Sequence, residues 1–143
     1  MADGVDDIAS LTADDRLEIQ ELIARYSTYE DTGDADAIAA LFTDDGSTVS
    51  SRGVSIVGRS AIAEAARRRW EKPEVHREVH WATNIIVEPN AEGAQARSYH
   101  MILVVEEERA IRVRGLAAKL DRLRQENGRW LFVQREALPL AAG

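Results

Sequence analysis

The chain has 143 residues, of which 25 are acidic and 18 basic, and its formal net charge is −7. This length fits one compact domain, and a composition of 45% hydrophobic and 30% charged residues excludes disorder, collagen and coiled coil for the whole chain. Cysteine is absent, which excludes disulfide bonds, a thiolate nucleophile and a cysteine-bound metal.

The negative charge is concentrated at the start of the chain, where five of the first fifteen residues are aspartate. The rest is nearly neutral and lacks a concentrated basic face, so no nucleic-acid partner is expected. The longest apolar stretch, Met101 to Val105, is far shorter than the roughly twenty residues of a membrane helix. Because the acidic start also lacks the basic segment of a secretory signal, we expect a soluble, cytoplasmic protein without a membrane partner.

Three helices are predicted in the first half of the chain. Thr12 can cap a first helix that Gly33 ends, and Asp34 can cap a short second one. The apolar stripe of the first helix is Ile19, Leu22, Ile23 and Tyr26. The second helix buries Ile38, Leu41 and Phe42 and ends in the turn-forming run 43–46.

Extended chain is predicted between the second and third helices. Residues 48–59 alternate apolar and polar side chains around a turn at 51–53. Ser60 can then cap a third helix, from Ala61 to about Lys72, which Pro73 ends.

From Glu78 the apolar period changes to two, which indicates strands. One side of the first strand carries Val79, Trp81, Ile85 and Val87. The other side carries His80, Ala82, Asn84 and Ile86. A turn at 89–93 leads to an antiparallel partner over 94–107.

The segment 111–125 fits two interpretations. Leucines at 116, 120 and 123 have helical spacing, but the hairpin signal Asn127-Gly128 and a strand-like run at 130–133 follow, so a strand is favoured. Helices followed by long meandering strands predict an α+β domain with helices packed on one face of a curved antiparallel sheet.

Several chemical motifs are absent or weak. No glycine-rich phosphate loop or G-x-S-x-G elbow occurs, which disfavours nucleotide hydrolysis, triad hydrolysis and dinucleotide oxidoreduction. His76 and His80 have the spacing of a helical metal site, but on a strand they would lie about 13 Å apart, so no metal is expected. Arginines 67–69 are flanked by Glu64 and Glu71 and are interpreted as a solvated helix face.

His80 is the candidate general base, because it lies on the less bulky face of its predicted strand. A carboxylate beside an imidazole fixes its tautomer and stabilises its protonated form. The candidate carboxylates near the end of the first helix are Glu30, Asp31 and Asp34. Helical periodicity places Glu30 on the buried stripe and Asp31 to its side, and the residues alone do not decide between them.

A set of short motifs resembles a known family. The set comprises Tyr26 with Asp31 five residues later, Gly33-Asp34, Leu41-Phe42-Thr43-Asp44-Asp45, Gly58-Arg59 with Ile62, His80-Trp81-Ala82-Thr83-Asn84, and Gly128-Arg129-Trp130. It resembles the SnoaL-like group of the nuclear transport factor 2 superfamily, which includes scytalone dehydratase, bile-acid dehydratase and ketosteroid isomerase. The resemblance covers residues 11–138 as a single domain, which leaves a flexible acidic leader at 1–10 and a tail at 139–143.

The resemblance implies a cone-shaped, curved antiparallel sheet closed by N-terminal helices, the cystatin-like α+β barrel. It also implies that Tyr26, Asp31 and His80 are catalytic, as a Tyr or Lys, an Asp and a His line the cavity of dehydratase-like members. His100 is the nearest match to a second histidine in the cavity of that family. It lies on the same face of the predicted hairpin as His80 if the numbers of the residues paired across the two strands sum to an even value. Asn84 and His100 are thus expected to bind substrate.

The expected function is that of a cofactor-independent, dehydratase-like lyase that acts on a small, apolar, cyclic or aromatic substrate. An isomerase or cyclase using the same base is one alternative, and a non-catalytic ligand-binding or accessory subunit is another. The ketosteroid isomerase pattern lacks a counterpart, because residues 94–105 carry no Asp or Glu. Lys119 stands where many relatives have an aromatic residue. A homo-oligomer, dimer or trimer, is expected.

Overall fold

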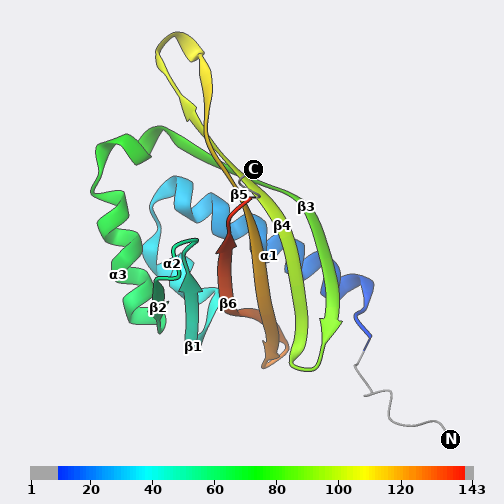
Figure 1. Ribbon diagram of the computed structural model, residues 1–143. Helices are drawn as coiled ribbons and strands as arrows, with labels where there is room; N and C mark the ends of the chain where they lie inside the picture. Colours follow the sequence, from blue (N-terminus) through cyan, green and yellow to red (C-terminus); the bar gives the residue numbers. More distant parts are fainter. Residues whose placement is uncertain (1–9, 141–143) are drawn as a thin grey trace, which may run out of the picture.

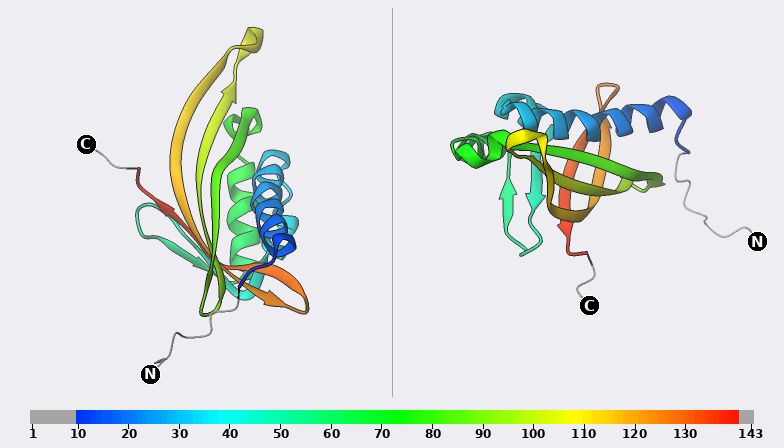
Figure 2. Two further views of the ribbon diagram at one scale, coloured as in Figure 1. Left: turned by 90° about the vertical axis from the view of Figure 1, so that its right-hand side faces the viewer. Right: turned by 90° about the horizontal axis from the view of Figure 1, so that it is seen from above.

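The structure is a computed structural model that describes residues 10–140. Its six-stranded sheet has the strand order β2-β1-β6-β5-β4-β3, is curved, and carries its helices on one face (Figures 1 and 2). The predicted α+β class, with helices on one face of a curved sheet, is therefore confirmed, except that β1 and β6 pair in parallel. Apart from residues 10, 139 and 140, the expected leader (1–10) and tail (139–143) lie outside the described residues. No helix among residues 10–140 is long and apolar enough to cross a membrane.

Helix α1 (Ala13–Thr32) forms as its caps predict. The Thr12 hydroxyl accepts the backbone N–H of Asp15, the Asp15 carboxylate accepts the backbone N–H of Thr12, and Gly33 ends the helix with a φ of 72°. The predicted stripe is buried against the sheet. The core comprises Ile19, Leu22, Ile23, Tyr26, Ile38, Phe42, Ile62, Val87, Leu123, Trp130 and Phe132, among others.

Helix α2 (Ala35–Ala40) is shorter than predicted. The run 43–46 does not form the expected turn, because strand β1 (Phe42–Val49) already begins at Phe42. Pairing with β6 (Arg129–Leu138) determines this outcome. β1 pairs with β6 in parallel, and the ring centres of Phe42 and Phe132 lie 5.4 Å apart. Pairing between distant segments thus overrides the local turn propensity of Asp-Asp-Gly.

Helix α3 (Arg59–Trp70) follows the predicted extended hairpin, in which β2 (Ser55–Val57) pairs with β1. The prediction that Ser60 caps α3 is wrong, since Gly58 is the cap and contributes no side-chain hydrogen bond. A 3₁₀ helix, η1 (Pro73–Arg77), then leads into the long strands.

Three long strands complete the sheet: β3 (Glu78–Asn90), β4 (Gly93–Val105) and β5 (Ile111–Glu126). A 3₁₀ turn, η2 (Glu107–Arg109), joins β4 to β5 at the end of a projecting arm (Figure 1). The strand interpretation of 111–125 is confirmed. The two-residue turn Asn127-Gly128, with φ values of 51° and 76°, connects β5 to β6 as the hairpin signal predicts.

A β-bulge at Asn84 changes which residues of β3 face inward. The pairing with β4 shifts between Thr83 and Ile86, and Asn84 adopts a φ of 53°. Trp81 and Val87, predicted to share a face, therefore lie on opposite sides, with Trp81 exposed and Val87 buried. The prediction of one continuous apolar side is wrong because the extra residue reverses the alternation.

Gly33 is needed for the packing of α3 as well as for the end of α1. A Cβ there would lie 2.3 Å from the Trp70 ring, whereas one at Gly53, which also has a positive φ, would meet nothing within 4 Å.

We expect Gly33→Ala to lower the free energy of unfolding by about 2–4 kcal/mol and Gly53→Ala by about 1 kcal/mol, measured by urea denaturation. Equal losses for the two variants would contradict this role of Trp70.

Candidate active site

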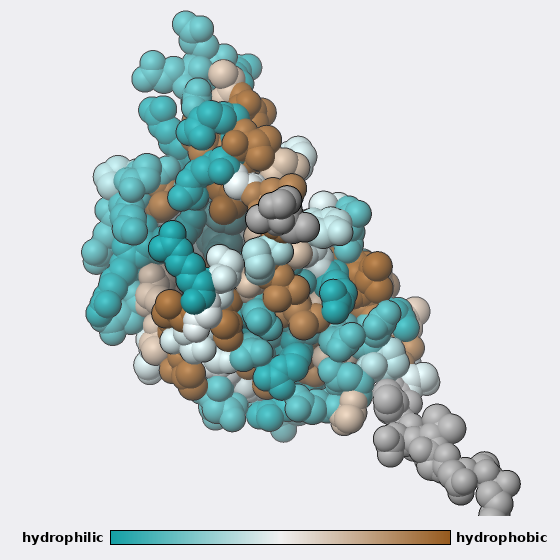
Figure 3. Space-filling view, in the orientation of Figure 1, coloured by the Kyte–Doolittle hydropathy of each residue, from teal (hydrophilic) through white to brown (hydrophobic). Residues whose placement is uncertain are grey.

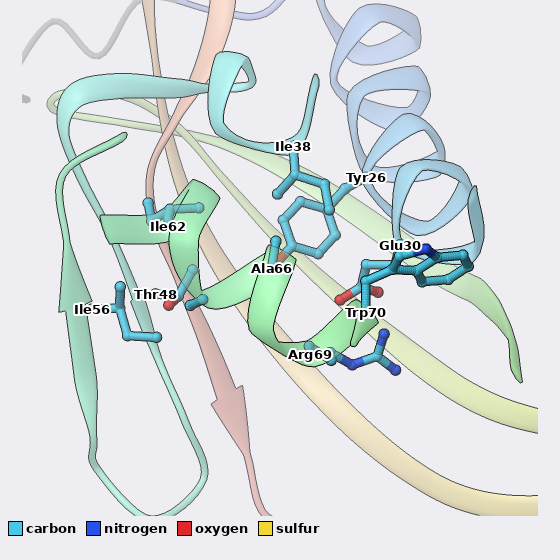
Figure 4. A pocket seen from close by; sticks show the side chains of 10 residues that line it. Tyr26, Glu30, Ile38, Thr48, Ile56, Ile62, Ala66, Arg69 and Trp70 are labelled. Carbon is cyan, nitrogen blue, oxygen red and sulfur yellow. The ribbon is translucent and has the colours of Figure 1, made fainter. Parts of the chain in front are cut away.

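A cavity of about 260 Å³ lies between α1, α3 and the β1–β2 hairpin (Figure 4). Its lining is mostly apolar, with one carboxylate and one guanidinium: Tyr26, Glu30, Ile38, Thr48, Ile56, Ile62, Ala65, Ala66, Arg69 and Trp70. A second hollow of about 160 Å³ shares Tyr26, Thr48 and Ile56 with the first and extends to Lys119 and Arg135. An apolar pocket with a few convergent polar groups is the usual form of a small-molecule site.

His80 and Asp31 are in direct contact with each other. Neither lines either hollow, but His80 reaches two side chains that line the main cavity, Glu30 and Arg69. Nδ1 of His80 lies 2.7 Å from Asp31 Oδ1, and the backbone N–H of His80 donates to the same oxygen at 3.0 Å. The His80 side chain is only 7% exposed. Asp31 therefore fixes both the backbone and the ring of His80. Because an ionised carboxylate only accepts hydrogen bonds, this contact places the proton on Nδ1 and leaves Nε2 available.

The other ring nitrogen of His80 faces two groups of opposite charge that line the cavity. Glu30 Oε2 and Arg69 Nη2 each lie 3.5 Å from Nε2. Glu30 Oε2 is buried and has no hydrogen-bond partner within residues 10–140. Two of the three candidate carboxylates, Glu30 and Asp31, thus reach His80 at its two ring nitrogens. The third, Asp34, instead caps α2 and accepts the backbone N–H of Ala37 at 3.1 Å.

The acidic pair at the end of α1 is unfavourable for the helix itself. Glu30 and Asp31 occupy the last turn, where the helix dipole favours positive charge, and no basic residue is present there. Such an arrangement costs about 0.3–1 kcal/mol per charge, so tertiary partners rather than local stability account for it.

Arg69 does not fit the predicted solvated face of α3. Arg67 and Arg68 do pair with exposed carboxylates, those of Asp36 and Glu64. Arg69 instead turns inward to the buried Glu78 carboxylate, which also accepts Arg114 Nη1 at 2.6 Å. The interpretation is therefore wrong for Arg69, because η1 and the start of β3 bring Glu78 beneath the end of α3.

Tyr26 points into the cavity from α1 (Figure 4). Its ring meets Phe42 and Phe132 edge-on at 6.0 and 6.1 Å. Burial, with the nearby negative charge of Glu30, raises the pKa of the Tyr26 hydroxyl. The Tyr26 hydroxyl therefore keeps its proton at neutral pH.

His100 shares the inner face of the sheet with His80. Ala82 pairs with His100 and His80 with Ile102, so paired numbers sum to an even value here, and the bulge in β3 produces this register. His100 Nε2 lies 2.8 Å from Ser98 Oγ, and burial lowers the pKa of His100 to about 2. A neutral, buried His100 lines neither of the two hollows described above.

Asn84 is not brought to the cavity. It is exposed on the far side of the bulge, where its side chain accepts the Thr83 hydroxyl at 3.1 Å. His76 lies apart from His80, since its Nε2 is 2.7 Å from the Trp70 carbonyl oxygen and its ring stacks on Trp70. Within residues 10–140, no group of three or more potential ligand side chains is placed to hold a metal.

Sequence reasoning missed the ionic cluster on the inner face of β5 and β6. Arg135 forms a two-point ion pair with Asp121, at 2.8 and 3.0 Å, and both side chains are almost fully buried. The Arg135 guanidinium lies 4.3 Å from the centre of the Tyr26 ring, and Lys119 Nζ lies 5.1 Å from it. Only the strand register places these distant residues around one tyrosine.

The family model described as a SnoaL-like domain matches residues 11–136. The chain belongs to the SnoaL-like family. This family includes polyketide cyclases and dehydratases, and its members are often enzymes. No curated protein matches the chain.

Solved structures described as cystatin-like are similar to the chain and confirm the predicted cystatin-like fold. An NTF2-like protein from Novosphingobium aromaticivorans is 27% identical, with a TM-score of 0.81 over 98% of this chain and 94% of that one. A protein of unknown function from Nostoc punctiforme is 28% identical, with a TM-score of 0.79 over 91% and 94%. A Catenulispora acidiphila protein in complex with S-DNPA is 23% identical, with a TM-score of 0.76 over 88% and 95%, and shows the fold alone.

Proposed function

We propose that this SnoaL-like protein is a cofactor-independent, dehydratase-like lyase in which His80 is the general base and Asp31 orients it. The observation that carries the proposal is the contact of 2.7 Å between His80 Nδ1 and Asp31 Oδ1 beside an apolar cavity. A base held by a carboxylate in a site of low dielectric needs little reorganisation during proton transfer.

The surroundings of His80 Nε2 suit a group that gains and loses a proton. When the ring is neutral, Nε2 is an acceptor, and Arg69 Nη2 at 3.5 Å is its donor. When the ring is protonated, Nε2–H is a donor, and Glu30 Oε2 at 3.5 Å is its acceptor. Both contacts are longer than a good hydrogen bond, so a substrate can take their place at Nε2.

The proposed reaction is the loss of water from a β-hydroxy carbonyl compound or a similarly activated ring. His80 Nε2 takes the proton from the carbon next to the carbonyl, the C–H electron pair forms the new double bond, and the C–O bond to the hydroxyl group breaks. The proton on His80 then leaves with the hydroxyl as water, which restores the base. Tyr26, which keeps its own proton, donates a hydrogen bond to the oxygen that gains charge.

The lining of the cavity favours a small apolar ring as substrate. Ile38, Ile56 and Ile62 face the same space as Tyr26, and this space is about 260 Å³. The Catenulispora acidiphila relative in complex with S-DNPA supports a small-molecule ligand for this fold. The proposed chemistry uses only side chains of this chain.

The test uses 4-hydroxy-2-tetralone, whose loss of water gives the fluorescent product 2-naphthol. We expect wild-type protein to accelerate this reaction, and His80→Ala and Asp31→Asn to lower kcat/KM by about 100- to 10,000-fold. Asp36→Asn, which makes the same change on the exposed surface, should retain full activity. Full activity in His80→Ala would eliminate the proposed base, and a product of unchanged mass would indicate an isomerase or cyclase instead.

We also propose that the chain forms a homo-oligomer, a dimer or trimer, through the outer face of its sheet. Trp81, Met101 and Leu116 are paired across β3, β4 and β5, and Trp81 and Leu116 are exposed there. Apolar side chains also gather at the surface along the β4–β5 arm (Figure 3).

Light scattering tests this assembly. The expected mass is at least twice the 15.9 kDa of one chain, and Trp81→Glu should reduce it to that of a single chain. Leu17→Glu alters an equally exposed apolar residue on α1 and should leave the assembly intact. A wild-type mass of 15.9 kDa would refute the proposal.

A further inference from the structure

Two cationic side chains come together at the second hollow. Lys119 and Arg135 both line the second hollow, which shares the lining residues Tyr26, Thr48 and Ile56 with the main cavity. Lys119 pairs with Ala137, and Asp121 pairs with Arg135, so Lys119 and Arg135 are diagonal neighbours on the inner face of β5 and β6. Asp121 pairs directly with Arg135, whereas Glu30 and Asp121 act on Lys119 only from beyond ion-pair distance.

Arg135 has a donor left over after its ion pair is complete. Its Nε and Nη2 bind the two Asp121 oxygens, while Nη1 is buried and has no partner within residues 10–140. The Arg135 side chain is only 2% exposed, so this donor is shielded from bulk water. An unpartnered buried donor costs free energy comparable to a lost hydrogen bond, and a bound acceptor would remove that cost.

Lys119 supplies the second cation. Among residues 10–140, no carboxylate oxygen lies within 4.0 Å of its Nζ. Burial and the positive charge of Arg135 lower the pKa of Lys119 to about 8. Both effects oppose the charged form, so an anion bound here would stabilise it.

We propose that Lys119 and Arg135 form a subsite for a carboxylate of the substrate. This inference rests on the proposed function and narrows the substrate to a ring compound that carries an acidic group, with its reacting carbon toward Glu30 and His80. A carboxylate accepts hydrogen bonds at both of its oxygens, which matches one ammonium and one free guanidinium N–H.

Binding of two matched probes, measured by titration calorimetry, tests the subsite. 2-Naphthoate carries a carboxylate, and 2-naphthamide presents a neutral group of nearly the same shape. We expect the wild-type protein to bind 2-naphthoate about 10- to 100-fold more tightly than 2-naphthamide. Equal affinities for the two probes would overturn the proposal. If Lys119→Met then lowered only kcat, the two cations would stabilise an oxyanion formed during the reaction and not a carboxylate of the substrate.

Two lysine variants separate the subsite from general electrostatics. Lys119→Met should lower the affinity for 2-naphthoate roughly tenfold and leave that for 2-naphthamide unchanged. Lys72→Met removes the only other lysine, which is exposed, and should change neither affinity. Unchanged 2-naphthoate binding in Lys119→Met would contradict the assignment.

The pH dependence provides a readout that needs no variant. The ionisable groups around Lys119 are Tyr26 and Glu30 from α1, Arg69 from α3, His100 from β4, Asp121 from β5 and Arg135 from β6. Lys119 is charged below its pKa of about 8, so 2-naphthoate affinity should fall as the pH rises through that value, and 2-naphthamide affinity should not. A flat profile for 2-naphthoate would overturn the proposal.

His80→Ala distinguishes this proposal from the proposed function. The variant lacks the base but keeps Lys119 and Arg135, so it should bind 2-naphthoate with the wild-type preference. If the preference disappears in His80→Ala and persists in Lys119→Met, the anion lies at the imidazole and the subsite is refuted. If the subsite is confirmed but His80→Ala dehydrates 4-hydroxy-2-tetralone as fast as the wild-type protein does, only the role of His80 as the base is refuted.

Discussion

The interaction between Asp31 and His80 connects the end of α1 to the start of β3. One carboxylate oxygen accepts both the backbone N–H and the ring Nδ1–H of His80, so the position of the strand and the orientation of the imidazole are fixed together. The same contact places Glu30, one residue earlier, at the other ring nitrogen. The C-terminal end of a helix disfavours negative charge, and contacts with His80 offset this cost for Glu30 and Asp31.

The two hollows carry different charges, and Tyr26 lines both of them. The charged groups of the main cavity are Glu30 and Arg69, and both reach His80 through contacts that suit proton transfer. On β5 and β6 the polar groups carry excess positive charge. Tyr26 packs on aromatic rings and lies against the Arg135 guanidinium. Its hydroxyl has a raised pKa and keeps its proton at neutral pH. A substrate that spans the cavity would be oriented by this difference in charge.

Local signals predicted much of the fold, whereas distant pairings determined what they missed. Thr12 and Gly33 define α1 because caps act within a few residues, and Asn127-Gly128 defines the last hairpin for the same reason. The entry of Phe42 into β1 depends on the edge of β6, and the reversal of faces depends on the bulge at Asn84. In the site, the resemblance selected Asp31, and periodicity correctly placed Glu30 on the buried side. Arg135 was missed, and the contacts of Arg69 and Lys119 were not predicted, because the partners of all three come from other elements.

The tautomer of His80 tests the central claim most directly, because a base at Nε2 requires the Nδ1 proton to be held by Asp31. Long-range ¹H–¹⁵N correlation spectra of the imidazole distinguish the two nitrogens. We expect neutral His80 to carry its proton on Nδ1 in the wild-type protein, and we expect Asp31→Asn to disturb this preference. A wild-type His80 that carries its proton on Nε2 would contradict the account.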